Sequence, residues 1–145
     1  MTSSALRLVA VLCVIAVAPT FATDIPAAVL DGYLSIHAAL AGDSLEGVRP
    51  SAEALAKAGQ GMGPSGSALA EAAGKLAAAS DIKAARAAFG DLSDAMRAMA
   101  GEGTGGTDVR LAYCPMVKKY WLQKGTEIAN PYYGSAMLRC GEFKK

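Results

Sequence analysis

The sequence predicts an all-α protein: an up-down four-helix bundle with a short, irregular C-terminal segment, rich in cysteine, methionine and aromatic residues, packed on it. Two observations lead to this prediction. Between residues 25 and 101, apolar residues recur every three or four positions, the period of a helix that buries one face. Turns at Gly42 and at residues 61–66, and a predicted helix cap at Ser80, divide this stretch into four segments, and short connections make consecutive helices antiparallel neighbours.

The first helix is predicted to begin after Asp24 as its N-cap and to end at Gly42. The second is expected to follow a cap at Asp43 or Ser44, and Pro50 predicts a kink or a restart within it. The apolar residues of the first helix step by four, three and four positions, which places them on one face: Val29, Tyr33, Ile36 and Leu40.

A turn at residues 61–66 precedes a third, alanine-rich helix around residues 69–76. Ser80 is the predicted N-cap of the fourth helix. Alanine lets helices approach closely but leaves a thin core, so we expect the C-terminal segment to pack on the bundle. The apolar residues of the fourth helix follow the a/d spacing of a bundle helix: Ile82, Ala85, Phe89, Leu92, Met96 and Met99.

The C-terminal segment, about residues 108–145, loses the helical period after a glycine-rich connector. Apolar residues alternate over a possible short strand that ends at Cys114. The rest of the segment is expected to be irregular, with a turn at Asn130-Pro131 and a single helical turn near Ser135.

Residues 1–22 are predicted to be a secretory signal peptide, so that residues 23–145 form one mature domain. Arg7 supplies the positive charge, a short apolar run follows, and Thr20-Phe-Ala22 offers a cleavage site. Because the apolar run is too short to span a bilayer, we expect an exported protein without stable membrane insertion after cleavage.

Charge is unevenly distributed along the mature chain, although its sum is close to zero. Residues 23–103 hold six Lys or Arg and ten Asp or Glu, whereas residues 104–145 hold seven and three. The absence of a basic surplus argues against a nucleic-acid binder. Two explanations of the uneven charge remain open: the two parts pack against each other, or the basic part docks on an acidic partner.

Cys114 and Cys140 are the cysteines of the predicted mature chain, and each stands close to a methionine. Cys114-Pro-Met116 places two sulfurs two positions apart, and Met137-Leu-Arg-Cys140 places two more one helical turn apart. Thiolate and thioether sulfur select Cu(I) and similar soft ions, so these four residues are candidate metal ligands. His37, the only histidine, is either a nitrogen ligand or a buried histidine with satisfied hydrogen bonds.

The alternative is a disulfide between Cys114 and Cys140, the usual state of paired cysteines in an exported protein. Loop entropy would make this bridge worth about 3.5 kcal/mol. The protein would then be a disulfide-stapled interaction module without metal, docking through its basic C-terminal face.

Catalysis has little support, since a Cys114–His37 nucleophile pair lacks an identifiable third group to orient the ring; we expect a protein that is not an enzyme.

Three parts of the chain together resemble a known family, domain of unknown function 3347, which occurs alone or appended to periplasmic adaptor subunits of copper and silver efflux pumps. The resemblance covers nearly all of the mature chain, and its C-terminal block is the specific part. The matching residues are Leu30–Leu40 with Gly42-Asp-Ser-Leu45, Ala85–Ser93, and Tyr113-Cys-Pro-Met116 with Tyr120-Trp-Leu122 and Ile128–Glu142.

The resemblance implies a periplasmic helical domain tied to metal homeostasis, with an efflux adaptor or another metal carrier as its partner and no established catalytic role. The family pattern has a histidine, Cys-Pro-Met and Met-x-x-Cys at the positions of the candidate ligands. The chain departs from this pattern at Val117-Lys-Lys119, where a longer stretch containing glycine is usual. The candidate ligands carried over are His37, Cys114, Met116, Met137 and Cys140.

Overall fold

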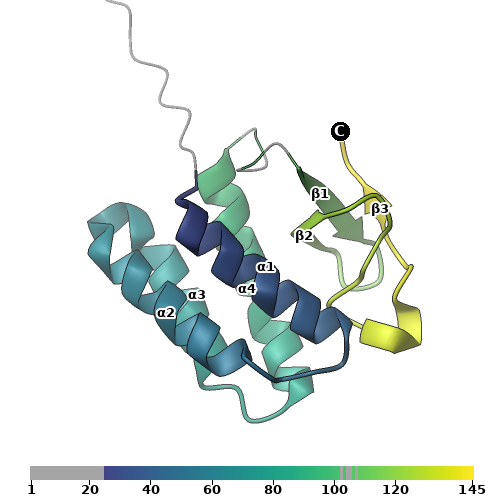
Figure 1. The fold of residues 1–145 in the computed structure, drawn as a ribbon, viewed down its shortest axis with the longest axis horizontal. Coiled ribbons are helices and arrows are strands. Elements are labelled where there is room, and N and C mark those ends of the chain that lie inside the picture. Colours follow the sequence, from purple (N-terminus) through teal and green to yellow (C-terminus); the bar gives the residue numbers. More distant parts are fainter. Residues whose placement is uncertain (1–24, 102, 104–105, 107) are drawn as a thin grey trace, which may run out of the picture.

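A computed structural model describes residues 25–101, 103, 106 and 108–145 (Figure 1). The predicted signal peptide and the predicted N-cap Asp24 lie outside the described residues. Within them, no helix is long and apolar enough to cross a membrane. Four helices come first and run up and down: α1 (Ala27–Ala41), α2 (Val48–Gly61), α3 (Ser67–Ala77) and α4 (Ile82–Ala100), with a short 3₁₀ turn, η1 (Gly63–Gly66), between α2 and α3.

The prediction of an all-α fold is wrong, because the chain after α4 forms a three-stranded antiparallel sheet. The strand β1 (Val109–Cys114) lies between β2 (Lys119–Lys124) and β3 (Glu142–Phe143). The short strand predicted to end at Cys114 is confirmed, whereas β2 and β3 replace structure that was expected to be irregular. The single helical turn expected near Ser135 forms as a 3₁₀ turn, η2 (Gly134–Met137).

The sheet also changes the packing between the first and the last helix. Consecutive helices pack together, but α1 and α4 touch at few positions, and β2 packs against both of them. The helices and the sheet share one apolar core, as the thin alanine-rich bundle led us to expect. The predicted apolar faces of the first and fourth helices are buried, and the largest side chains in them are Tyr33, Ile36, Leu40, Phe89, Leu92 and Met96.

One tyrosine of α1 connects the helices to the sheet. The Tyr33 hydroxyl lies 2.7 Å from Ser93 Oγ on α4 and accepts a hydrogen bond of 3.0 Å from the backbone N–H of Leu122 on β2. Its ring stacks on Phe89, with 5.1 Å between the ring centres. Burial raises the pKa of Tyr33, so the hydroxyl stays protonated.

The N-cap of α4 is Asp81 rather than the predicted Ser80. Asp81 Oδ1 accepts a hydrogen bond of 2.8 Å from the backbone N–H of Ala84, which is the contact that an N-cap side chain makes. Both residue types are good caps, so the apolar spacing located the helix but not its first residue.

The second helix begins later than predicted. Its N-cap is Gly47 rather than Asp43 or Ser44, and α2 continues through Pro50 as its third residue. Neither the kink nor the restart predicted at Pro50 occurs, because the N–H groups of the first helical turn have no partner within the helix and proline removes no hydrogen bond there.

The acidic α4 and the basic C-terminal segment are in contact. Lys119 Nζ on β2 lies 2.6 Å from a carboxylate oxygen of Asp94 and 3.7 Å from one of Asp91. The guanidinium of Arg97 lies 4.3 Å from the centre of the Tyr120 ring, a cation–π contact. Of the two explanations for the uneven charge, these contacts favour packing of the two parts against each other.

Candidate functional site

An ion pair between α4 and the loop after α1 anchors the C-terminal segment. Arg86 Nη2 donates to Asp43 Oδ1 at 2.5 Å and to the carbonyl of Leu40 at 2.9 Å. Arg86 Nε donates to the carbonyl of Pro131 at 3.0 Å, and the backbone N–H of Ser135 donates to Asp43 Oδ2 at 3.0 Å. The hydrogen bonds from Ser135 and Arg86 lower the pKa of Asp43 to about 2, so this carboxylate is charged at neutral pH.

Gly134 fits over this ion pair because it has no side chain. Its φ is +57°, and a Cβ atom there would lie 2.0 Å from Asp43 Oδ1 and 2.2 Å from Arg86 Nη2. Glycine adopts such a conformation without steric cost. The segment therefore reaches the ion pair here and continues through η2 towards Cys140.

The loop that follows β2 is held by the buried amide of Gln123. Gln123 Oε1 accepts from Trp121 Nε1 at 2.9 Å and from the backbone N–H of Ala129 at 3.0 Å. Gln123 Nε2 donates to the carbonyls of Glu127 at 2.8 Å and Lys124 at 3.2 Å. A fully hydrogen-bonded buried amide fixes the path of the chain on both sides of it.

Asn130 joins the two cysteines. This fully buried residue donates from Nδ2 to Cys114 Sγ at 3.3 Å and to the carbonyl of Cys140 at 2.7 Å. Its Oδ1 accepts from the backbone N–H of Tyr132 at 2.8 Å, and its own N–H donates to the carbonyl of Leu138 at 2.8 Å. The end of β1 and the chain after η2 are thereby held against one amide.

Gly141 returns the chain to the sheet directly after Cys140. Its φ is +139°, and a Cβ atom there would lie 2.8 Å from Trp121 Cη2 and 3.0 Å from the carbonyl oxygen of Tyr113. Only glycine tolerates this close approach, which sets Cys140 beside the end of β1.

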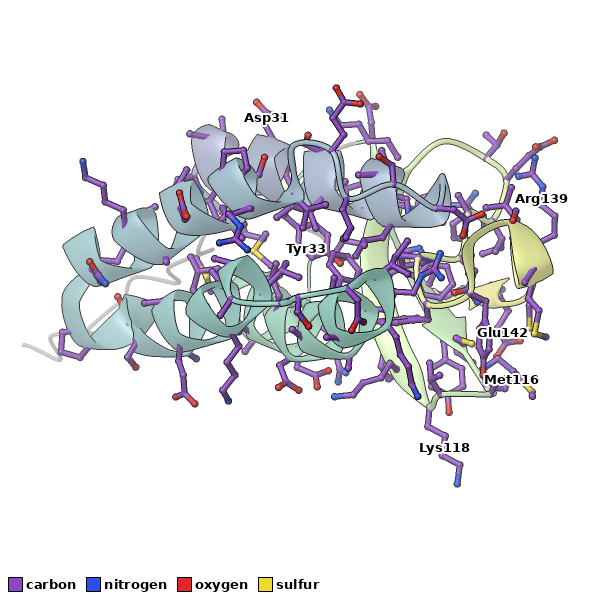
Figure 2. The ribbon with its side chains drawn as sticks, turned by 90° about the horizontal axis from the view of Figure 1, so that it is seen from below. Asp31, Tyr33, Met116, Lys118, Arg139 and Glu142 are labelled. Carbon is purple, nitrogen blue, oxygen red and sulfur yellow. The ribbon has the colours of Figure 1, made fainter. Side chains whose placement is uncertain are left out.

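The four predicted sulfur ligands lie at the same end of the sheet. Cys114 and Cys140 are free thiols, the first buried and the second half-buried. The backbone N–H of Cys140 donates to the carbonyl of Met137 at 2.9 Å, which keeps these two residues on one turn. Met116 is 61% exposed on the turn between β1 and β2, and Figure 2 shows it at the same end of the molecule as Arg139 and Glu142.

The fifth candidate ligand, His37, is not joined to the sulfurs. Its Nε2 lies 2.8 Å from the carbonyl oxygen of Ala129, and neither cysteine is a hydrogen-bond partner of its ring within the described chain. Burial lowers the pKa of His37. The contacts are those of a buried neutral histidine that donates Nε2–H to a backbone carbonyl, and they form no Cys114–His37 pair.

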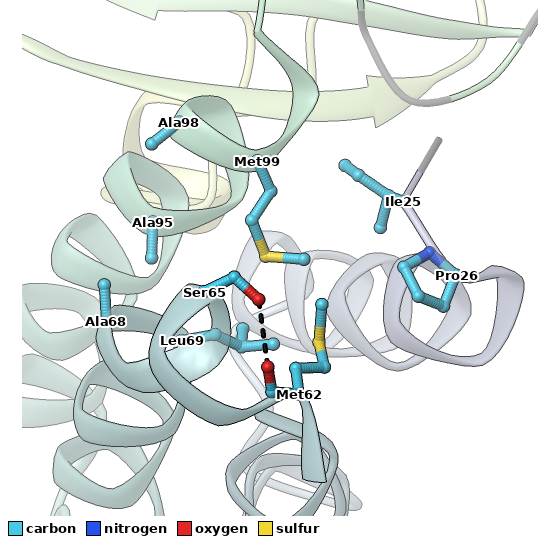
Figure 3. Close-up of a pocket in the computed structure, with 9 residues that line it drawn as sticks. All are labelled: Ile25, Pro26, Met62, Ser65, Ala68, Leu69, Ala95, Ala98 and Met99. Atoms are coloured by element: carbon cyan, nitrogen blue, oxygen red, sulfur yellow. Dashed lines mark hydrogen bonds between the residues drawn. The ribbon is translucent and has the colours of Figure 1, made fainter. Parts of the chain in front are cut away.

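The other methionines among the described residues pack in or against the core. Met96 is buried, and Met62 and Met99 are partly buried. Met62 and Met99 line a cavity of about 370 Å³ with Ile25, at the ends of α2 and α4 (Figure 3). Met99 and Met96 thus have the core role predicted from their spacing on the fourth helix.

Sequence reasoning missed the polar residues that assemble the site: Asn130 was predicted only as a turn residue, and Arg86 was given no role. A buried amide and a surface amide look alike in a single sequence. The one available signal was the high density of aromatic residues around Asn130 and Gln123, because polar residues enclosed by rings in the fold must hydrogen-bond to each other or to the backbone.

Among the described residues, no group of three or more His, Cys, Asp and Glu side chains is placed to hold a metal ion. A site built on Cys114 and Cys140 therefore needs methionine sulfur for further side-chain ligands, and such a donor set suits soft ions.

Comparisons with protein-family models, with curated proteins and with solved structures find no match for this chain. The resemblance to domain of unknown function 3347 accordingly stays a prediction.

Proposed function

We propose that this chain is an exported, periplasmic soft-metal-binding protein that holds Cu(I), Ag(I) or a similar ion. Cys114, Cys140 and Met137 are the proposed inner ligands, and Met116 is the outer one. The observation that carries the proposal is the buried amide of Asn130, which donates both to the sulfur of Cys114 and to the backbone carbonyl of Cys140 and so connects the two cysteine positions.

Exposure differs among the proposed ligands, and this difference suggests a direction of metal transfer. Met116 is open to solvent, Met137 and Cys140 are half-buried, and Cys114 is fully buried. A partner that carries a soft ion reaches Met116 first, and exchange of ligands then brings the ion to the thiolates. A periplasmic efflux adaptor or another metal carrier is the partner that we propose, and we assign no catalytic role to the chain.

The experiment is a Cu(I) competition titration of the full chain, exported from its own leader and purified under reducing, anaerobic conditions, against a chromophoric Cu(I) chelator. Cys114→Ser and Cys140→Ser are each expected to abolish tight binding, and Met137→Leu to weaken it. Met62→Leu is the matched control, because it removes the same thioether at the cavity near the ends of α2 and α4, away from the cysteines. Equal Cu(I) affinity in the wild type and both serine variants would refute the proposal.

A second candidate is the interaction module without metal, stapled by a Cys114–Cys140 disulfide. It is favoured by the exposed apolar side chains of Met116 and Val117, 61% and 37% exposed, beside Lys118 on the β1–β2 turn. Alkylation of the unfolded protein, purified without reductant, separates the two functions by intact mass. Two alkyl groups support the metal site, whereas none before reduction and two after it establish the bridge and support the module.

A further inference from the structure

The orientation of the Asn130 amide is decided by its surroundings. Oδ1 accepts a hydrogen bond from the backbone N–H of Tyr132 at 2.8 Å, and a backbone N–H can only donate. The NH₂ group must therefore face the other way, towards Cys114 Sγ at 3.3 Å and the carbonyl of Cys140 at 2.7 Å. Both of its hydrogens are directed at the two cysteines.

We propose that Asn130 is a positioning residue of the soft-metal site, which donates a hydrogen bond to the Cys114 sulfur and holds Cys140 beside it. This inference rests on the proposed function. A thiolate that binds a metal ion at the position of Cys114 has no water to solvate its charge, because the residue is fully buried. An N–H donor at that sulfur compensates for the missing water and stabilises the charged, metal-binding form.

The second hydrogen of the same amide fixes the geometry of the site. Cys114 comes from β1 and Cys140 follows η2, and the sheet register joins β1 to β3 only at residues 112–113 and 142–143. The Asn130 contacts therefore connect the end of β1 to the segment after η2, beyond the last residue pair of β1 and β3. The amide both sets the separation of the cysteines and supplies the donor to one of them.

The test compares two substitutions that each turn a buried amide into a carboxylate of the same shape. Asn130→Asp replaces the donor at Cys114 Sγ with a negatively charged acceptor. Gln123→Glu makes the same chemical change at a buried amide whose contacts are Trp121, Ala129 and two backbone carbonyls, with no sulfur among them. Both variants are expected to lower the melting temperature.

Only Asn130→Asp is expected to weaken Cu(I) binding, by about 10- to 100-fold, measured by chelator competition on the exported full chain well below the melting temperature. A spectroscopic readout accompanies the affinity. In the Hg(II)-loaded protein, the sulfur-to-mercury charge-transfer band is expected to move to longer wavelength in Asn130→Asp and not in Gln123→Glu, because a thiolate that loses an N–H donor releases electron density more easily.

Should Asn130→Asp fail to fold, Asn130→Ser takes its place, since the serine side chain carries no charge and is too short to reach Cys114 Sγ; the same weakening and the same band shift are expected. An affinity within threefold of the wild type, or an equal loss in Gln123→Glu, overturns the role of Asn130 while leaving the metal site in place. Absence of Cu(I) binding in the reduced wild type overturns the proposed function and this inference together.

Discussion

Tyr33→Phe tests how the sheet that carries Cys114 is attached to the helices. The substitution keeps the buried ring and its stacking on Phe89 and removes only the hydroxyl. The backbone N–H of Leu122 on the edge strand β2 then loses its acceptor, and Ser93 Oγ loses a partner at 2.7 Å. These groups are buried, so water does not replace the lost hydrogen bonds.

A buried donor left without an acceptor costs about 1–3 kcal/mol, and we expect Tyr33→Phe to lower the free energy of unfolding by about 2 kcal/mol. For a chain of this size the melting temperature should fall by about 8 °C. Urea unfolding followed by circular dichroism measures the free energy, and a thermal scan measures the temperature. An unchanged urea m-value would show that the denatured state is the same in both proteins.

Tyr113→Phe is the control, because the Tyr113 hydroxyl makes no hydrogen bond within the described chain while its ring packs on Tyr120 at 4.7 Å. This control is expected to change stability by less than about 0.5 kcal/mol. If both tyrosine variants unfold at the same urea concentration, the hydroxyl of Tyr33 does not dock the sheet and the argument from the unpaired N–H is wrong.

Two further predictions concern the anchor of the C-terminal segment. Gly134→Ala places a Cβ atom inside the ion pair of Arg86 and Asp43 and should destabilise the protein more than Gly47→Ala, which has a similar positive φ of 73° but open space around it; equal melting temperatures would contradict this. Asp43→Asn should be less stable than the wild type above about pH 4, and the difference in urea midpoint should shrink as pH falls towards 2. The pKa of Asp43 is about 2 in the folded protein, against an ordinary value of 3.8. A carboxyl group whose pKa is lowered by folding stabilises the fold above its unfolded pKa and loses that effect as pH falls through its folded pKa. A difference in urea midpoint that stays constant from pH 7 to 2 would contradict this.

The helices could be predicted from the sequence because one physical signal governs them. Tyr33, Phe89 and Met96 are buried at the positions where the three- and four-residue spacing placed them. Their first residues were harder to predict, since adjacent Ser80 and Asp81 are both competent caps and the local sequence does not decide between them.

The strand β2 escaped prediction for a reason visible in its burial. Trp121, Leu122 and Gln123 are consecutive and all buried, because helices cover one face of the sheet and the C-terminal segment covers the other. A strand buried on both faces has no two-residue alternation to detect. The two residues of β3, Glu142 and Phe143, are too few to show any period, so the fold class was predicted from the helices alone.

The candidate site shows what a single sequence can and cannot supply. The spacing of Cys114, Met116, Met137 and Cys140 was enough to nominate sulfur ligands, because donor chemistry is a property of residue type. Where these residues lie in the fold depends on contacts between residues far apart in the chain. Asn130 reaches back to β1, and Arg86 on α4 holds the carbonyl of the next residue, Pro131.

These long-range contacts have a consequence for how metal binding and folding are related. The amides of Asn130 and Gln123 are fully hydrogen-bonded, and Asn130 contacts the sulfur of Cys114 and the backbone carbonyl of Cys140. In small metal domains that fold around their ion, the binding energy is largely folding energy, and removal of the metal unfolds the chain. Here the helices and the buried amides fix the backbone that carries the proposed ligands. The energy of metal binding is therefore not needed to fold the chain, and we expect the reduced, metal-free protein to keep its fold.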